Sequence, residues 1–156
     1  MLKLSIIVSS VTVLMLSLSV EAVAADVVCP PDEAITPCRC IEAFLYPGTV
    51  VIDCFSVSAT DTTANDALDA FVKMPDVSSV SYLYLHNNSL TRIPDQVKSF
   101  TQLKFVDFWN NKIASIGAGA FNLEDASNPL LTLSLYDNQL TAIAPGAFKG
   151  SILSLK

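Results

Sequence analysis

Residues 103–113 read LKFVDFWNNKI, and two other segments repeat their spacing of apolar residues and asparagine. These are VSYLYLHNNSL at residues 80–90 and LLTLSLYDNQL at residues 130–140. Each fits the pattern L-x-x-L-x-L-x-x-N-x-L with Val, Ile or Phe at some L positions, and each has an isoleucine three residues later. The starts lie 23 and 27 residues apart. Self-similarity at such a period predicts a repeat architecture in which neighbouring units stack.

Within each repeat the L-x-L pair predicts a short strand whose alternate side chains point into a core. The pairs are Leu83 with Leu85, Val106 with Phe108, and Leu133 with Leu135. An asparagine follows where the chain must turn out of the strand, at Asn88, Asn111 and Asn138. An amide there can hydrogen-bond backbone groups of neighbouring coils that would otherwise lack partners. We therefore expect stacked coils that share a core and need a cap at each end.

The side chains that alternate with the inward ones are expected on the concave face of the stack. They are Tyr82, Tyr84, His86, Phe105, Asp107, Trp109, Thr132, Ser134 and Tyr136. The column of His86, Trp109 and Tyr136 is aromatic in all three repeats, and such side chains often dominate binding energy. Repeat proteins commonly bind through this side, so we predict a protein ligand here. The alternative is that these rings only cover a partly buried sheet face.

The first 24 residues predict a secretory signal peptide. Lys3 precedes an apolar run from Leu4 to Val20, and Ala22-Val23-Ala24 gives a small-x-small cleavage pattern. The alternative is a signal anchor that stays in the membrane. No later stretch approaches 18 uninterrupted apolar residues, so the mature chain is predicted to be secreted and to contain no membrane span.

All four cysteines lie close to the predicted mature N-terminus, at Cys29, Cys38, Cys40 and Cys54. In a secreted chain this cluster predicts two disulfides, while a zinc site is disfavoured by the C-x-C spacing and the absence of a nearby histidine. Cys38 and Cys40 are too close to bond to each other. Two pairings stay open: Cys29–Cys38 with Cys40–Cys54, or Cys29–Cys40 with Cys38–Cys54.

The chain divides into four predicted segments. Residues 1–24 are the signal, residues 25–61 are a cysteine-rich cap with a hairpin through 49–54, and residues 62–79 are a helix and connector. The helix is predicted by apolar residues at helical spacing. These are Ala64, Ala67, Leu68, Phe71 and Val72. Residues 80–156 hold three full repeats and a fourth that starts at Ile152, so we expect the sequence to be C-terminally incomplete.

Composition and isolated motifs exclude most other functions. The chain has 15 acidic and 9 basic residues and a net charge of −6, which argues against nucleic-acid binding, and its 51% hydrophobic content argues against disorder. His86 is the sole histidine and has no nucleophile or ligand motif around it. We expect no enzyme activity, no cofactor and no metal. Asn87-Asn88-Ser89 is an N-x-S acceptor, which makes Asn87 a candidate for glycosylation.

The repeat pattern resembles the leucine-rich repeat family. Residues 116–121 and 143–148 also look like the I-x-x-G-A-F half of its extracellular members, and the four cysteines resemble their N-terminal cap. The resemblance implies an α/β repeat solenoid, a horseshoe with short parallel strands on its concave face and a disulfide-stapled cap. It also implies Cys29–Cys40 and Cys38–Cys54 as the disulfide pairs.

The cap has a narrower resemblance. Residues 29–40, which read CPPDEAITPCRC, together with Ile52-Asp53-Cys54, resemble the cap in the arthropod family of the oplophorus-luciferin 2-monooxygenase non-catalytic subunit. This resemblance implies a secreted accessory chain that associates with an enzyme. The alternative is the N-terminal part of a leucine-rich-repeat receptor ectodomain. In both cases the partner is a protein whose identity the sequence does not give.

Overall fold

The computed structural model describes residues 27–44, 46–123, 130–150 and 155–156. The predicted signal peptide, residues 124–129 of the long second repeat and residues 151–154 of the fourth lie outside this range. Within the described residues, no helix has both the length and the apolar character needed to cross a membrane.

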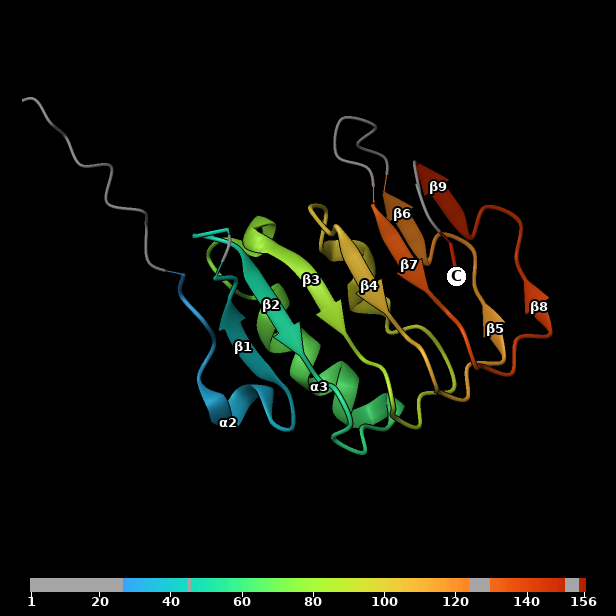
Figure 1. Ribbon diagram of the computed structural model, residues 1–156, viewed down its shortest axis with the longest axis horizontal. Helices are drawn as coiled ribbons and strands as arrows, with labels where there is room; N and C mark the ends of the chain where they lie inside the picture. Colours follow the sequence, from blue (N-terminus) through green and yellow to red (C-terminus); the bar gives the residue numbers. More distant parts are fainter. Residues whose placement is uncertain (1–26, 45, 124–129, 151–154) are drawn as a thin grey trace, which may run out of the picture.

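A five-stranded sheet in the order β1-β2-β3-β4-β7 runs along the molecule (Figure 1). In the cap, β1 (Arg39–Glu42) and β2 (Val50–Asp53) form an antiparallel hairpin. From β2 onward all pairs are parallel, through β3 (Val80–Tyr84), β4 (Phe105–Asp107) and β7 (Thr132–Ser134). The sheet thus continues from the cap into the repeats without a break.

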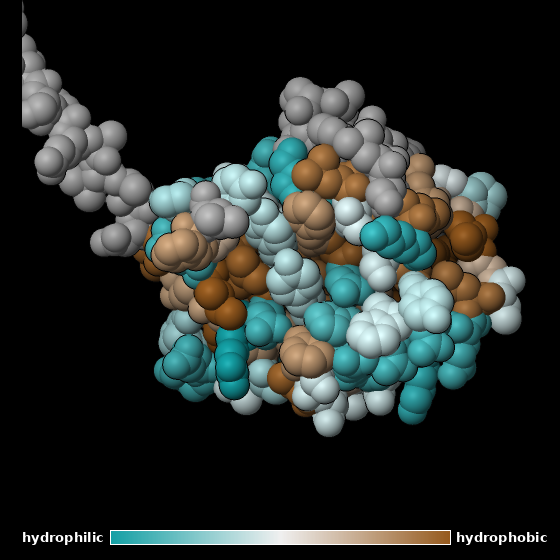
Figure 2. All heavy atoms as spheres, in the orientation of Figure 1, coloured by the Kyte–Doolittle hydropathy of each residue, from teal (hydrophilic) through white to brown (hydrophobic). Residues whose placement is uncertain are grey.

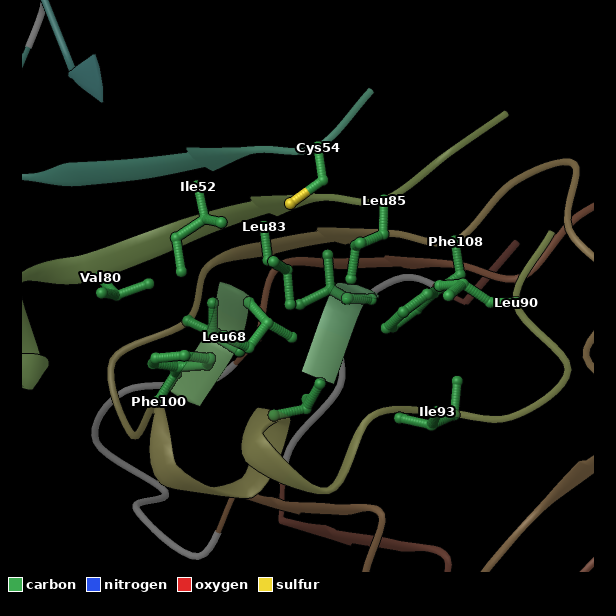
Figure 3. Packing of buried hydrophobic residues seen from close by; sticks show 14 of the residues in the cluster. Ile52, Cys54, Leu68, Val80, Leu83, Leu85, Leu90, Ile93, Phe100 and Phe108 are labelled. Atoms are coloured by element: carbon green, nitrogen blue, oxygen red, sulfur yellow. The ribbon is translucent and has the colours of Figure 1, made fainter. Parts of the chain in front are cut away.

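The inner face of this sheet carries the core. Leu83, Leu85 and Phe108 are fully buried, and Val106, Leu133 and Leu135 are at most 7% exposed. These inward orientations confirm the prediction from the L-x-L pairs. Figure 3 shows Leu83 and Leu85 beside Ile52 and Cys54 of the cap, with Leu68 and Phe100 facing them from below. Cap and repeats therefore share one hydrophobic core.

Helix α3 (Asp61–Val72) covers the inner face next to the cap, where the apolar spacing predicts a helix. Its first turn is closed by a capping box in which Thr60 accepts from the Thr63 amide and Thr63 Oγ1 accepts from the Thr60 amide at 2.9 Å. The helix ends shortly before Pro75, which cannot continue it. Its buried side chains are Ala64, Ala67, Leu68 and Phe71.

The part of each repeat that follows the parallel strand and its turn differs from one repeat to the next. The first repeat has a 3₁₀ helix, η2 (Asp95–Ser99), and the shorter η1 (Val77–Ser79) precedes β3. The second and third repeats instead pair β5 (Ser115–Ile116) with β8 (Ala142–Ile143) and β6 (Phe121–Leu123) with β9 (Phe148–Gly150). In the turns before β6 and β9, Gly119 and Gly146 have φ values of 68° and 72°, a region that favours glycine.

The cap is closed by two disulfides. The bonds are Cys29–Cys40 and Cys38–Cys54, which is the pairing implied by the family resemblance, and no free cysteine remains. Helix α2 (Asp32–Ile35) lies between the first two cysteines and buries Ile35, an element that the sequence analysis does not predict. The second bond attaches the end of β2 to the segment just before β1, so it fixes the first strand of the parallel series.

The asparagine of each repeat connects consecutive coils, as its position predicts. The Asn111 side chain accepts from the Leu90 amide at 3.0 Å and donates to the carbonyls of Leu85 and Phe108 at 2.9 and 3.0 Å. Asn138 makes the same bonds one coil later, to the Ile113 amide and the carbonyls of Phe108 and Leu135. The Leu85 and Phe108 carbonyls thus each accept from the asparagines of two coils.

The residue before each of these asparagines has a left-handed backbone. Asn87, Asn110 and Asp137 have φ values of 56°, 52° and 54°. Asn and Asp tolerate this region better than other residues with a side chain. The Asn-Asn and Asp-Asn pairs therefore serve two purposes, since the first residue turns the chain and the second satisfies the backbone inside the turn.

Candidate binding face

The outward side chains of the parallel strands form one surface, which we call the aromatic face. Its residues from the repeats form three columns across the strands. The columns are Tyr82, Phe105 and Thr132; Tyr84, Asp107 and Ser134; and His86, Trp109 and Tyr136. All nine are partly or fully exposed, so the structure brings the predicted residues together on one side of the sheet. Their role in binding stays a prediction.

The cap adds a fourth row that the sequence reasoning missed. Strand β2 pairs with β3 so that Val51 lies beside Tyr82 and Asp53 beside Tyr84. Phe55, two residues further on, continues the third column. In the sequence, Val51, Asp53 and Phe55 alternate with Ile52 and Cys54, which are buried, and such alternation is the mark of a strand. Because the cap lacks the repeat pattern, this alternation alone does not indicate a strand parallel to those of the repeats.

The third column is a row of stacked rings. The ring centroids of Phe55 and His86 lie 4.4 Å apart with 23° between the planes, and those of His86 and Trp109 lie 6.0 Å apart with 28°. Backbone hydrogen bonds between the turns, such as that from the Asn87 amide to the Trp109 carbonyl at 2.9 Å, keep the coils aligned here. Tyr136 follows in the next coil and is 67% exposed. Rigid rings on a fixed backbone bind at little entropic cost.

The middle column is acidic around a tyrosine. Asp53 and Asp107 lie on the strands on either side of Tyr84. Burial first, and then the nearby Tyr82, Asp107 and Asp53, raise the pKa of Tyr84 above its ordinary value. One Asp107 oxygen accepts from the Trp109 amide at 2.9 Å, and the other lies 3.5 Å from His86 Nδ1.

The first column is the more apolar edge of the face. Tyr82 and Phe105 stack in parallel with centroids 5.2 Å apart. They line a shallow pocket of about 330 Å³ together with Tyr46 of the cap hairpin and Lys104. Figure 2 shows that this side of the molecule mixes hydrophilic and hydrophobic residues across the strands. Such a mixture of rings and polar tips is suited to a protein partner more than to a lipid.

Asn87, the candidate glycosylation site, lies at the edge of the aromatic face. Its side chain is half-buried, and its Oδ1 accepts from Asn110 Nδ2 at 2.7 Å. Neighbouring Asn88 is occupied by the backbone of the turn, where it accepts from the Ala59 amide and donates to the Cys54 carbonyl. A glycan on Asn87 would border the third column. Glycosylation of Asn87 stays a prediction.

The described residues contain no group of three or more His, Cys, Asp or Glu side chains placed to hold a metal ion. The contact between His86 and Asp107 is explained by their positions in neighbouring coils of the face. That the chain is not an enzyme and takes no cofactor stays a prediction.

Comparison with known proteins supports the repeat assignment. The family model described as Leucine Rich Repeat matches residues 79–100, the first repeat. The leucine-rich repeat-containing G-protein coupled receptor 4 of Xenopus tropicalis is 41% identical over 63 residues, which are 40% of this chain and 6% of that receptor. No solved structure matches the chain. With the parallel sheet and the two disulfides, these similarities indicate a leucine-rich repeat fold.

Proposed function

We propose that this chain is an extracellular binding module that recognises another protein through the aromatic face. The observation that carries the proposal is the row of Phe55, His86 and Trp109, held at fixed spacing across neighbouring coils. Rings of this kind, exposed at the centre of a surface with a polar surround, are the usual hot spots of protein interfaces. In the proposed arrangement the repeats curve as a solenoid, and the aromatic face is its concave side.

An extracellular location is supported by the chemistry of the cap. Two disulfides are typical of proteins that fold in an oxidising compartment, and the signal predicted over residues 1–24 would deliver the chain there. The similar Xenopus protein is by its name a receptor. We therefore propose secretion or display outside the cell.

Two settings fit this module. The similarity to a leucine-rich-repeat receptor favours a receptor ectodomain, whereas the resemblance of the cap at residues 29–40 favours a non-catalytic accessory chain of a secreted enzyme. The two differ in where the natural gene product is found. Immunoblotting of medium and membrane fractions from the native tissue distinguishes them, since an ectodomain stays with the membranes and an accessory chain enters the medium.

Replacing Trp109 with alanine is expected to lower capture of the native partner at least tenfold and to leave secretion unchanged. Its ring is 36% exposed at the centre of the third column, so truncation removes a contact and leaves the core intact. The measurement is cross-linking of tagged full-length protein in native secretions, followed by quantitative mass spectrometry.

Phe44→Ala is the matched control for Trp109→Ala. Phe44 is 96% exposed in the connection between β1 and β2, outside the aromatic face, so its loss removes a ring that is more accessible than Trp109. We expect the captured protein to be retained by this variant. Equal capture by the unaltered protein and by Trp109→Ala would show that the aromatic face is not the binding surface.

A further inference from the structure

Two carboxylates are held in fixed positions on the aromatic face. Asp53 and Asp107 occupy equivalent positions on β2 and β4, on either side of Tyr84 in β3. Each uses one oxygen to accept from the amide two residues later, Phe55 at 3.1 Å and Trp109 at 2.9 Å. These bonds orient both side chains in the same way and use one oxygen of each carboxylate. The other Asp107 oxygen lies 3.5 Å from His86 Nδ1, and a carboxylate oxygen can accept from more than one donor.

Among the described residues, no lysine or arginine forms an ion pair with either carboxylate. Across the described part of the chain, the one ion pair within 4.0 Å joins His86 and Asp107. Arg39 lies opposite Asp53 in the β1–β2 hairpin but makes no ion pair with it. Arg39 thus shares the sheet face with Asp53, and Lys104 borders the first column, but among the described residues neither forms an ion pair with these carboxylates. The two carboxylates lie in a chain whose net charge is −6. Such a surface attracts a positively charged partner over a distance of about a Debye length.

Aromatic rings stand directly beside these charges. Phe55, His86 and Trp109 form the adjoining column, and Tyr84 lies between the two carboxylates. A planar guanidinium can stack on a ring while it donates two hydrogen bonds to a carboxylate, which an ammonium group cannot do. The combination of ring and carboxylate therefore favours arginine over lysine.

The spacing of the two carboxylates sets the spacing of the cations. Neighbouring strands lie about 4.8 Å apart, so residues two strands apart are separated by roughly 10 Å. One guanidinium is too small to bridge that distance. An extended peptide in the polyproline II conformation advances about 3.1 Å per residue and has three residues per turn. Two arginines three residues apart therefore project from the same side, about 9 Å from each other, and match the two carboxylates.

We propose that the aromatic face binds an extended basic segment of a protein, in which two arginines three residues apart pair with Asp53 and Asp107 and stack on the neighbouring rings. This inference rests on the proposed function and specifies the chemistry of the partner. The segment crosses the parallel strands at the level of Tyr84. The stacked Tyr82 and Phe105 lie to one side and provide contact area for an apolar residue of the same segment.

The test uses three labelled nonapeptides of glycine and serine and the full-length secreted protein. The first carries two arginines three residues apart, the second carries citrulline at both positions, and the third carries the two arginines adjacent to each other. Chemical-shift titration measures their dissociation constants. We expect the first peptide to bind at least tenfold more tightly than the citrulline peptide and about threefold or more tightly than the third.

The double variant Asp53→Asn with Asp107→Asn tests the site, and Glu33→Gln with Asp66→Asn is its matched control. Both pairs change the net charge by the same amount, but Glu33 and Asp66 are exposed on α2 and α3, away from the face. Asparagine keeps the oxygen that accepts from the Phe55 and Trp109 amides, so the fold is expected to persist, and thermal unfolding checks this. Where the double variant melts early, the two single variants are titrated instead. The site variants should weaken binding of the first peptide at least tenfold and the control less than twofold.

Three results would overturn the inference: no saturable binding of the first peptide, equal binding of the citrulline peptide, or equal weakening by the site and control pairs. The proposed function has a separate outcome. If capture of the native partner falls with Trp109→Ala but is unchanged in the Asp53 and Asp107 variant, the face binds a protein without using these charges. If Trp109→Ala retains its partner, the proposed function fails whatever the peptides show.

Discussion

Replacing Asn111 with alanine is expected to lower the free energy of unfolding by about 3 to 5 kcal/mol. Asn111 is 7% exposed, and its side-chain Oδ1 accepts a hydrogen bond from the buried backbone N–H of Leu90 at 3.0 Å. Truncation leaves that N–H without a partner inside the protein and removes the bonds to the Leu85 and Phe108 carbonyls. An orphaned buried donor alone costs about 1 to 3 kcal/mol.

The loss is measured by urea or thermal unfolding of the purified chain, where it should lower the midpoint temperature by about 10 °C or more. Lys112→Ala is the control, because that side chain is the exposed neighbour of Asn111 and should change the stability by about 0.5 kcal/mol or less. If Asn111→Ala and Lys112→Ala had the same unfolding midpoint, the hydrogen bonds of the asparagine would contribute no more to the free energy of unfolding than the water contacts that replace them.

The asparagines act as a connected series, because they share carbonyls. The Leu85 carbonyl accepts from Asn88 and Asn111, and the Phe108 carbonyl accepts from Asn111 and Asn138. Each coil therefore supplies acceptors for the next one, which is the nearest-neighbour coupling expected of stacked repeats. The same series holds the aromatic face in register, since each asparagine follows the last ring of its coil by two residues.

Most of the repeat region could be predicted from sequence because its physics is local and periodic. Leu83 and Phe108 point inward and Asn111 lies buried in the turn, as the pattern requires. The helix over Asp61–Val72 was visible in apolar spacing and in the threonines at its start. In the strands, the turns and the helix, an apolar side chain is stable only in the core and an asparagine only where it can pair with the backbone of the turn. The position of a residue in the repeat therefore determines what it contacts.

The cap could be predicted only in part because its contacts are not periodic. Elimination left two disulfide pairings, and only the resemblance to extracellular repeat proteins favoured Cys38–Cys54. That choice depends on the register of the β1–β2 hairpin, which pairs Arg39 with Asp53 and so places Cys38 beside Cys54 just beyond this pair. For the same reason Asp53 and Phe55 were missed, since their place on the face depends on β2 pairing with β3 across a helix of 12 residues.

The two neighbouring aromatic residues of the second repeat are expected to differ sharply when each is cut back to alanine. Phe108 is fully buried and packs edge-on against Phe121 with ring centroids 6.3 Å apart, so Phe108→Ala should cost about 3 to 5 kcal/mol of stability. Trp109 points to the opposite side of the sheet and is 36% exposed, so Trp109→Ala should cost about 1 kcal/mol or less. Parallel denaturant unfolding of both variants measures the difference.

The paired measurement separates folding from recognition within one dipeptide. A ring removed from the inner face leaves a cavity that the stacked coils cannot close, because Leu85 and Leu135, its equivalents in the neighbouring coils, are held by backbone hydrogen bonds between coils. A ring removed from the outer face leaves only a surface change, so Trp109→Ala protein should lose about 1 kcal/mol of stability or less while losing its partner. Comparable destabilisation by both variants would mean that the Trp109 ring belongs to the packing of the sheet, and the aromatic face would then be a structural cover instead of a binding surface.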